Sequence, residues 1–223
     1  MINSLKRKLI VSCQAWEDTP FYGANYMHAM AESALMAGAG GIRANGPENI
    51  REIKKTVKLP MIGIYKLPDA RGIKIITPNF EAARELAEAG AEIIAIDATR
   101  EARSNDEELA EFIEEIKAKL KVLVMADISN FDEGVRAEKA GANLVATTMS
   151  GYTSYTKKTE GPDLELIKQL AAVVAIPIIG EGRYANPAQV NQALDLGAHS
   201  VVVGTSITAP WEIAARFVRA ITP

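Results

Sequence analysis

The stretch AGAEIIAIDA, residues 89–98, joins the end of a helical segment to an apolar strand through Ala89-Gly90. The same arrangement returns at 37–44 (AGAGGIRA), 140–147 (AGANLVAT) and 197–204 (GAHSVVVG), at steps of about fifty residues. Further apolar runs lie at 8–14, 59–66, 122–128 and 176–182. A period that holds two strand–helix units, repeated four times, predicts eight parallel strands with eight helices. We therefore predict an α/β fold, a single (β/α)8 TIM barrel that occupies residues 1–223 as one domain.

The composition is that of a globular domain and gives no sign of a nucleic-acid or membrane partner. A chain of 223 residues with 48% hydrophobic and 24% charged residues suits one globular domain. The net charge of −3 favours neither nucleic acid nor an anionic membrane as a partner. The single cysteine, Cys13, excludes an internal disulfide, and no apolar run approaches the roughly 20 residues of a membrane helix. We expect a cytoplasmic protein without a signal peptide that acts on a small molecule.

Polar residues stand where the predicted strands end. In this fold the active site is built at the carboxyl ends of the strands, so these residues are expected to form one ring around the barrel mouth. The ring consists of Gln14, Arg43, Lys66, Asp97, Asp127, Thr147 or Thr148, Glu181 and Gly204-Thr205. Two polar loops follow the third and sixth strands, at 67–77 and at 150–161, the second of which contains Tyr152. Such loops usually cover a site.

Lys66 and Glu181 are the candidates for acid–base chemistry. Alternation along the third strand puts Ile62, Ile64 and Lys66 on one face, and the seventh strand carries Glu181 beside Ile179. These strands lie opposite each other in an eight-stranded ring, which suits removal of a proton from one face of a carbon and its return to the other. A lysine enclosed in an apolar mouth has a lowered pKa and can act as a base. A structural Lys–Glu ion pair is the alternative.

Two glycine-containing strand ends predict a phosphate site. Gly182 and Arg183 follow the seventh strand, and Gly204 and Thr205 follow the eighth. The loops after these two strands commonly bind phosphate in barrels of this type, through glycine amides and a helix N-terminus.

We expect no metal and no cofactor. The two histidines, His28 and His199, belong to no cluster with the spacing of metal ligands. Cys13 lies inside an apolar strand, so we interpret it as a small buried hydrophobic residue. A carboxylate site for magnesium at Asp97 and Asp127 is the alternative. The dinucleotide-binding glycine fingerprint is absent from the sequence, so a nicotinamide cofactor has no support.

The chain resembles the N-acetylmannosamine-6-phosphate 2-epimerase family along essentially its whole length. The matching stretches are IVSCQA (10–15), GGIRAN (41–46), IGIYK (62–66), IIAIDAT (93–99), MADIS (125–129), SGYTSYT (150–156), EGR (181–183) and VVVGTSIT (201–208). The resemblance implies a metal-independent barrel, in amino-sugar and sialic acid catabolism, that interconverts N-acetylmannosamine 6-phosphate and N-acetylglucosamine 6-phosphate. It implies Lys66 as the base at carbon 2, Glu181 as the acid on the other face, and Arg43, Asp127 and Gln14 as substrate contacts. Thr148 and Tyr152 complete the predicted substrate contacts.

The chain departs from the family pattern at two positions. Ala209 and Leu67 stand where members usually carry an arginine, so two positive charges are missing on the expected ligand side. An epimerase for an unphosphorylated or differently substituted 2-acetamido sugar is therefore the first alternative. A Schiff-base lyase or aldolase that uses Lys66 as its nucleophile is the second, and a barrel that binds a sugar phosphate without turnover is the third. Family membership favours a homodimer. Trp211 and Phe217 of the last helix could form a dimer face or pack on the barrel, and we expect packing on the barrel.

Overall fold

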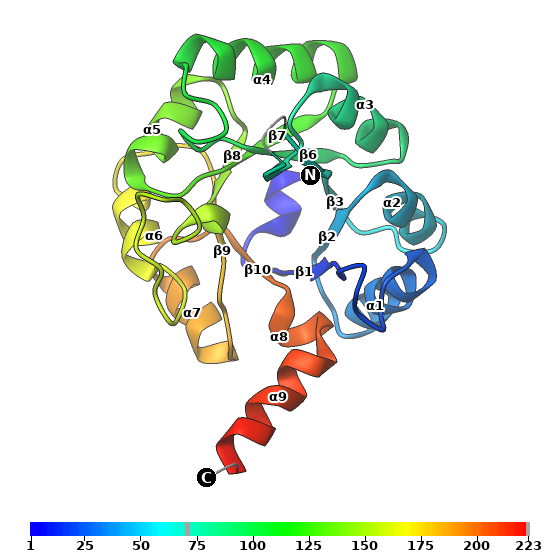
Figure 1. The fold of residues 1–223 in the computed structure, drawn as a ribbon. Coiled ribbons are helices and arrows are strands. Elements are labelled where there is room, and N and C mark those ends of the chain that lie inside the picture. Colours follow the sequence, from blue (N-terminus) through cyan, green and yellow to red (C-terminus); the bar gives the residue numbers. More distant parts are fainter. Residues whose placement is uncertain (70–71, 222–223) are drawn as a thin grey trace.

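A closed barrel of eight parallel strands forms the centre of the computed structural model, which describes residues 1–69 and 72–221. Around the ring the strands follow the order β1-β2-β3-β6-β7-β8-β9-β10, and β10 pairs with β1. Figure 1 looks along the barrel and shows the helices around it. The barrel strands are β1 (Leu9–Cys13), β2 (Gly41–Asn45), β3 (Met61–Ile64), β6 (Ile93–Asp97), β7 (Leu123–Asp127), β8 (Leu144–Ala146), β9 (Ile178–Glu181) and β10 (Ser200–Val203). The predicted fold is confirmed.

The helices lie between the strands along the chain. They are α1 (Ala24–Met36), α2 (Pro47–Lys54), α3 (Phe80–Glu88), α4 (Asp106–Leu120), α5 (Phe131–Lys139), α6 (Leu164–Ala171), α7 (Pro187–Asp195), α8 (Thr205–Thr208) and α9 (Pro210–Ile221), with the 3-10 turns η1 (Ile2–Leu5) and η2 (Thr147–Met149). Asn or Asp side chains cap the first turns of α3, α4, α5, α6 and α7, as their sequences favour. None of the described helices combines the length and the apolar character that crossing a bilayer requires.

Two apolar clusters hold the barrel together. The larger one fills the layer between strands and helices and includes Ile42, Leu86 and Ile113. The smaller one fills the barrel interior, where Leu5 from η1 joins strand residues such as Ile62 and Ile179. Strands buried on both faces explain why the apolar runs show no alternation.

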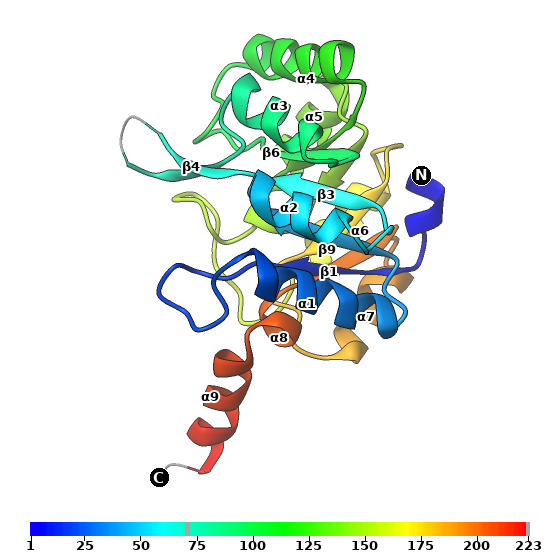
Figure 2. The same cartoon turned by 90° about the vertical axis from the view of Figure 1, so that its right-hand side faces the viewer.

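The two ends of the barrel differ. At the amino ends of the strands, η1 closes the barrel, and His199 Nε2 lies 2.9 Å from the carbonyl oxygen of Ile2. At the other end lie the segment after β1, the hairpin after β3 and the loop after β8, which Figure 2 shows on one side of the molecule. The predicted site end is therefore the end that the long connections surround.

The segment at 67–77 is not a plain loop. Lys66–Pro68 forms β4 and Lys74–Ile76 forms β5, an antiparallel pair, while Ala70 and Arg71 lie outside the described residues. The third barrel strand therefore ends at Ile64, and Lys66 begins the hairpin instead of ending that strand. The prediction was wrong here because β4 and β5 have three residues each, too few for a period to be read.

The prediction for the last helix was also wrong in part. Figures 1 and 2 both show α9 running outward from the barrel, and no residue of 210–221 is buried. Trp211 stacks on Phe21, with ring centroids 6.1 Å apart, but Phe217 is 72% exposed. Among the described residues α9 packs on the barrel side through its start, and its distal apolar residues Phe217, Val218 and Ile221 are exposed.

Candidate active site

Arg43 is the centre of the polar mouth of the barrel. It is 1% exposed, and it is the middle residue of β2, from which its long side chain reaches across the barrel to Asp127 on β7. Its Nη1 and Nη2 donate to the two carboxylate oxygens of Asp127, at 3.1 and 2.6 Å. Such a two-pronged contact fixes both side chains, which come from strands far apart in the sequence.

Glu181 contacts the same guanidinium from β9. Its Oε2 lies 2.9 Å from Nη1 of Arg43 but has no well-aligned hydrogen-bond donor among the described residues. Burial raises the pKa of Glu181 to about 7; the positive charge of Arg43 opposes that rise, and the negative charge of Asp127 adds to it. A carboxyl group with a pKa near neutrality can carry a proton or lose it at physiological pH.

Lys66 approaches from the opposite side of the ring. Its backbone N–H donates to Oδ1 of Asn45, at 2.9 Å, which anchors the start of β4 to the end of β2. Burial, and then the positive charge of Arg43, lower the pKa of Lys66 to about 8, while Glu181 and Asp127 act in the other direction. Within residues 1–69 and 72–221, Lys66 forms no ion pair with Glu181, whose partner is Arg43. The alternative of a structural Lys–Glu bridge therefore has no support.

β3 and β9 face each other, with three strands between them in either direction around the ring. Glu181 is the last residue of β9, and Lys66 follows the end of β3 by two residues. Two groups with pKa values near 8 and near 7 on opposite sides of a mouth can exchange protons with the two faces of one carbon.

The remaining predicted contacts surround this centre. Thr148 in η2 donates to Oδ1 of Asp127 at 2.7 Å, and Gln14 donates to the hydroxyl of Ser12 at 2.6 Å. Asp97 lies next to Asp127 in the β6–β7 register and accepts from the Thr99 hydroxyl at 2.7 Å. Burial raises the pKa of Asp97 to about 6.

The predicted phosphate residues lie at the ends of two neighbouring strands. Gly182 follows β9 with φ of 112°, and Gly204 and Thr205 lead from β10 into α8. The guanidinium of Arg183, however, donates to the carbonyl oxygens of Gly161 and Ser150, at 2.9 and 2.7 Å. It also lies 5.3 Å from the ring centroid of Tyr152, so it ties down the loop after β8. Its part in phosphate binding stays a prediction.

Some residues that hold the site were not predicted from the sequence. Glu133, 1% exposed in α5, accepts from the hydroxyls of Ser129 and Tyr155 and from the backbone N–H of Arg100, at 2.7, 2.6 and 2.8 Å. It thereby joins the loops after β6, β7 and β8. A glutamate in the first turn of a helix usually faces solvent, so no sequence signal singles it out. Asn45 was visible as a strand-end residue in GGIRAN.

No metal-binding group emerges from the described residues. Across 1–69 and 72–221, no three His, Cys, Asp or Glu side chains gather in a way that could hold a metal ion. Asp127, half of the alternative magnesium site, has its two oxygens engaged by Arg43. Cys13 is buried, and burial raises the pKa of its thiol to about 12.

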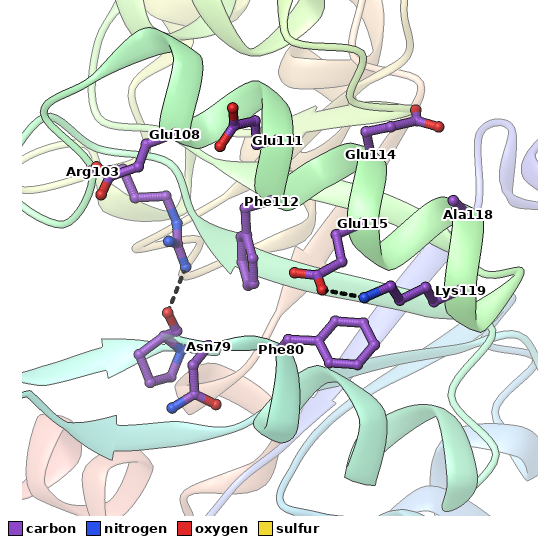
Figure 3. Close-up of a pocket in the computed structure, with 11 residues that line it drawn as sticks. Asn79, Phe80, Arg103, Glu108, Glu111, Phe112, Glu114, Glu115, Ala118 and Lys119 are labelled. Atoms are coloured by element: carbon purple, nitrogen blue, oxygen red, sulfur yellow. Dashed lines mark hydrogen bonds and ion pairs between the residues drawn. The ribbon is translucent and has the colours of Figure 1, made fainter.

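A hollow on the outside of the barrel lies between α3 and α4. Figure 3 shows its lining, in which Arg103 donates to the carbonyl oxygen of Pro78 at 2.9 Å and packs over the ring of Phe112. Four glutamates of α4 line its rim: Glu108, Glu111, Glu114 and Glu115. None of the predicted site residues lines this hollow, so it is separate from the barrel mouth.

The fold and the mouth together define a class, the (β/α)8 barrels with ionisable side chains gathered at the carboxyl ends of their strands. Comparison with known proteins then identifies the family. The profile described as "Putative N-acetylmannosamine-6-phosphate epimerase" matches residues 27–223, and the chain belongs to that family. The resemblance noted from the sequence is thereby confirmed.

Similar proteins span the chain from end to end. A relative from Caldanaerobacter subterraneus, named "Putative N-acetylmannosamine-6-phosphate 2-epimerase", is 49% identical over 98% of this chain and 92% of its own. One of the same name from Clostridioides difficile is 47% identical over 99% of both chains. The solved N-acetylmannosamine-6-phosphate 2-epimerase from Clostridium perfringens is 42% identical, with a TM-score of 0.92 over 99% of this chain and 96% of that one. FabK from Thermotoga maritima, at 18% identity, a TM-score of 0.61 and coverage of 93% and 61%, shares the fold alone.

Proposed function

We propose that this chain is a cofactor-independent epimerase that interconverts N-acetylmannosamine 6-phosphate and N-acetylglucosamine 6-phosphate, in amino-sugar and sialic acid catabolism. The observation that carries the proposal is the placement of Lys66 and Glu181 on opposite sides of the barrel, with pKa values near 8 and 7. The names of the full-length relatives support it. The barrel formed by residues 1–223 serves as the one catalytic domain.

The reaction proceeds through the open form of the sugar, because the carbon 2 proton is acidic only beside the carbon 1 aldehyde. The unprotonated amine of Lys66 removes that proton, the C–H bond breaks, and its electron pair moves into the aldehyde to give an enolate. The carboxyl group of Glu181 then donates its proton to the opposite face of carbon 2. Lys66 ends protonated and Glu181 ionised, and proton exchange with water restores the starting state.

Arg43 serves this cycle in two ways. Its guanidinium is buried beside the mouth and supplies positive charge where the enolate oxygen develops. It also holds Asp127 and Glu181 in place. Gln14, Thr148 and Tyr152 are the proposed substrate contacts, and the two strand ends at Gly182-Arg183 and Gly204-Thr205 are the proposed phosphate site.

The missing arginines make an unphosphorylated sugar the second candidate substrate. Ala209 is 6% exposed and brings no charge to the end of α8, and Arg183 already donates to loop carbonyls. Phosphate binding would then rest on backbone amides and on the exposed lysines of the 150–161 loop, such as Lys158. Both substrates must therefore be tested side by side.

The test is proton NMR in heavy water with the phosphorylated and the unphosphorylated N-acetylmannosamine. Conversion of the phosphorylated sugar alone to its gluco epimer, with deuterium at carbon 2, supports the full proposal. Turnover of the free sugar would mean that Ala209 and Leu67, in place of the family's arginines, reflect a different substrate. If neither sugar is converted, the proposed epimerase activity is refuted. Borohydride trapping of a covalent adduct on Lys66 would instead favour the Schiff-base lyase.

We further propose that the protein is a cytoplasmic homodimer in which α9 contributes to the interface. A helix of 12 residues without a buried side chain is marginal in water, and its distal residues Phe217 and Ile221 are 72% and 84% exposed. A second copy offers the same apolar face and can cover it symmetrically. Light scattering should give twice the chain mass of 24.0 kDa, and Phe217→Glu should give the monomer. A monomeric wild-type protein would refute the dimer.

A further inference from the structure

The β4–β5 hairpin places a second lysine beside the proposed base. In its antiparallel register Lys66 pairs with Ile76 and Pro68 pairs with Lys74. Partners across a ladder, and every second residue along a strand, lie on the same face. Lys66 and Lys74 therefore share one face of the hairpin, whereas Leu67 and Ile75 lie on the other. Lys74 is thus not a positional replacement for the arginine that the family carries at position 67.

Trp16, in the segment after β1, contacts both lysines. The Nζ of Lys66 lies 4.9 Å from the centroid of the indole ring, and the Nζ of Lys74 lies 5.6 Å from the same centroid. The two nitrogens are therefore no more than about 10.5 Å apart, the sum of these two distances. An aromatic face attracts a cation, so one ring holds two like charges near each other.

The charge of Lys74 is not neutralised by a carboxylate. In the described parts of the chain, no Asp or Glu oxygen lies within ion-pair distance of its Nζ. The other charged groups that face Lys66 are Arg43 from β2, Asp127 from β7 and Glu181 from β9. Both carboxylates already contact Arg43. Lys74 therefore adds an uncompensated positive charge on the hairpin side of Lys66.

We propose that Lys74 is a positioning residue for the proposed base, and that its ammonium group, held near Lys66 by Trp16, favours the unprotonated form of the Lys66 amine. The proposal rests on the proposed function. Removing a proton from carbon 2 requires a free electron pair on Nζ, and a nearby positive charge disfavours the protonated form. After burial and Arg43, which lower the pKa of Lys66 most, Lys74 acts in the same direction.

The size of the effect follows from the distance. Two unit charges about 10 Å apart in a water-like dielectric change a pKa by about 0.3 units, and by more where the protein excludes water. Removal of the charge in Lys74→Gln should raise the pKa of Lys66 by at least about 0.3 units. Reversal of the charge in Lys74→Glu should raise it by about twice as much. Lys74→Arg keeps the charge and should leave it unchanged.

The experiment measures this pKa in two independent ways. Direct titration uses NMR of protein with carbon-13 in the lysine side chains, with the Lys66 signal assigned by its loss in Lys66→Arg. The second readout is the alkaline limb of the pH dependence of kcat/KM. Lys168→Gln on α6 is the control, since it removes the same charge from a remote exposed position. The shifts should shrink in 1 M salt, because Lys74 is exposed and the interaction is screened.

Each outcome decides the matter. An ordered series in which Arg, Gln and Glu at position 74 give increasing pKa values supports the proposal, and a smaller Gln effect in a Trp16→Leu background supports the part of the indole. Equal pKa values for Lys74→Glu and wild type at low salt refute it. The proposal is also refuted if Lys74→Gln raises the KM for the phosphorylated sugar but leaves the alkaline limb of kcat/KM unchanged, because Lys74 would then bind substrate. The NMR titration needs no turnover. It therefore tests the effect of Lys74 on Lys66 even if the protein proves not to be an epimerase.

Discussion

Substitution of Glu181 by Gln separates the two halves of the proposed reaction. Glutamine keeps the shape of the side chain but cannot donate a proton. Lys66 would still remove the carbon 2 proton of the manno sugar and, in heavy water, could return deuterium to the same face. We therefore expect isotope exchange at carbon 2 of N-acetylmannosamine 6-phosphate without epimerisation.

The structure sets the scale of the loss. Burial raises the pKa of Glu181 to about 7, so the carboxyl group can hold the required proton near neutral pH. Loss of a general acid costs about 10²–10⁴-fold in rate, which corresponds to about 3–5 kcal/mol of transition-state stabilisation. Arg43 keeps both of its bonds to Asp127, so the fold should lose only about 1–3 kcal/mol. The variant should remain folded and testable.

Proton NMR in heavy water follows both events in one sample. The carbon 2 signal of the manno sugar should fade while the gluco product forms at least a hundredfold more slowly than in the wild type. Lys66→Met is the mirror-image control: it should lose exchange from the manno sugar and keep exchange from the gluco sugar through Glu181. Epimerisation by Glu181→Gln within tenfold of the wild-type rate would contradict the two-residue mechanism.

Three further outcomes are expected. The pH dependence of kcat/KM should be bell-shaped with a maximum near 7.5. The reaction needs one proton on the Lys66–Glu181 pair, which carries two protons below about pH 7 and none above about pH 8. A flat profile from pH 6 to 9 would contradict this. Gly180→Ala places a Cβ against the Tyr184 hydroxyl and should destabilise the fold by about 1–3 kcal/mol, with partial recovery in a double variant with Tyr184→Phe, as thermal unfolding would show. Leu5→Ala opens a cavity at the closed end of the barrel and should cost about 2–5 kcal/mol in chemical unfolding; a loss below 1 kcal/mol would mean that η1 is dispensable for stability.

Much of the fold could be read from local signals. The glycines of the repeated motif, at 38, 90, 141 and 197, all adopt positive φ, at 85, 105, 89 and 109°. That backbone conformation is one that glycine adopts at little cost, so the helix ends were visible in the sequence. The apolar runs that follow them have no alternation, because strands of a parallel barrel are covered on both faces.

Local sequence signals did not predict the parts of the structure that depend on tertiary contacts. β4 and β5 form only because they pair with each other, and Thr77 accepts from and donates to Tyr65 beside them. Trp211 and Phe217 of α9 do not by themselves show what covers them. We expected packing on the barrel, which the exposure of Phe217 contradicts.

The sequence by itself determined the barrel and put Glu181 at the end of a strand opposite β3, because strand count is a property of the chain order, although Lys66 itself lies in the hairpin after β3. The tertiary structure alone decided which charges meet. Arg43 and Asp127 are 84 residues apart in sequence, and their contact, with the shared contact to Glu181, depends on closure of the ring. Burial of Lys66 and Glu181, and then the charge of the nearby Arg43, shift the pKa values on which the proposed chemistry depends, and burial and distance exist only in the folded protein.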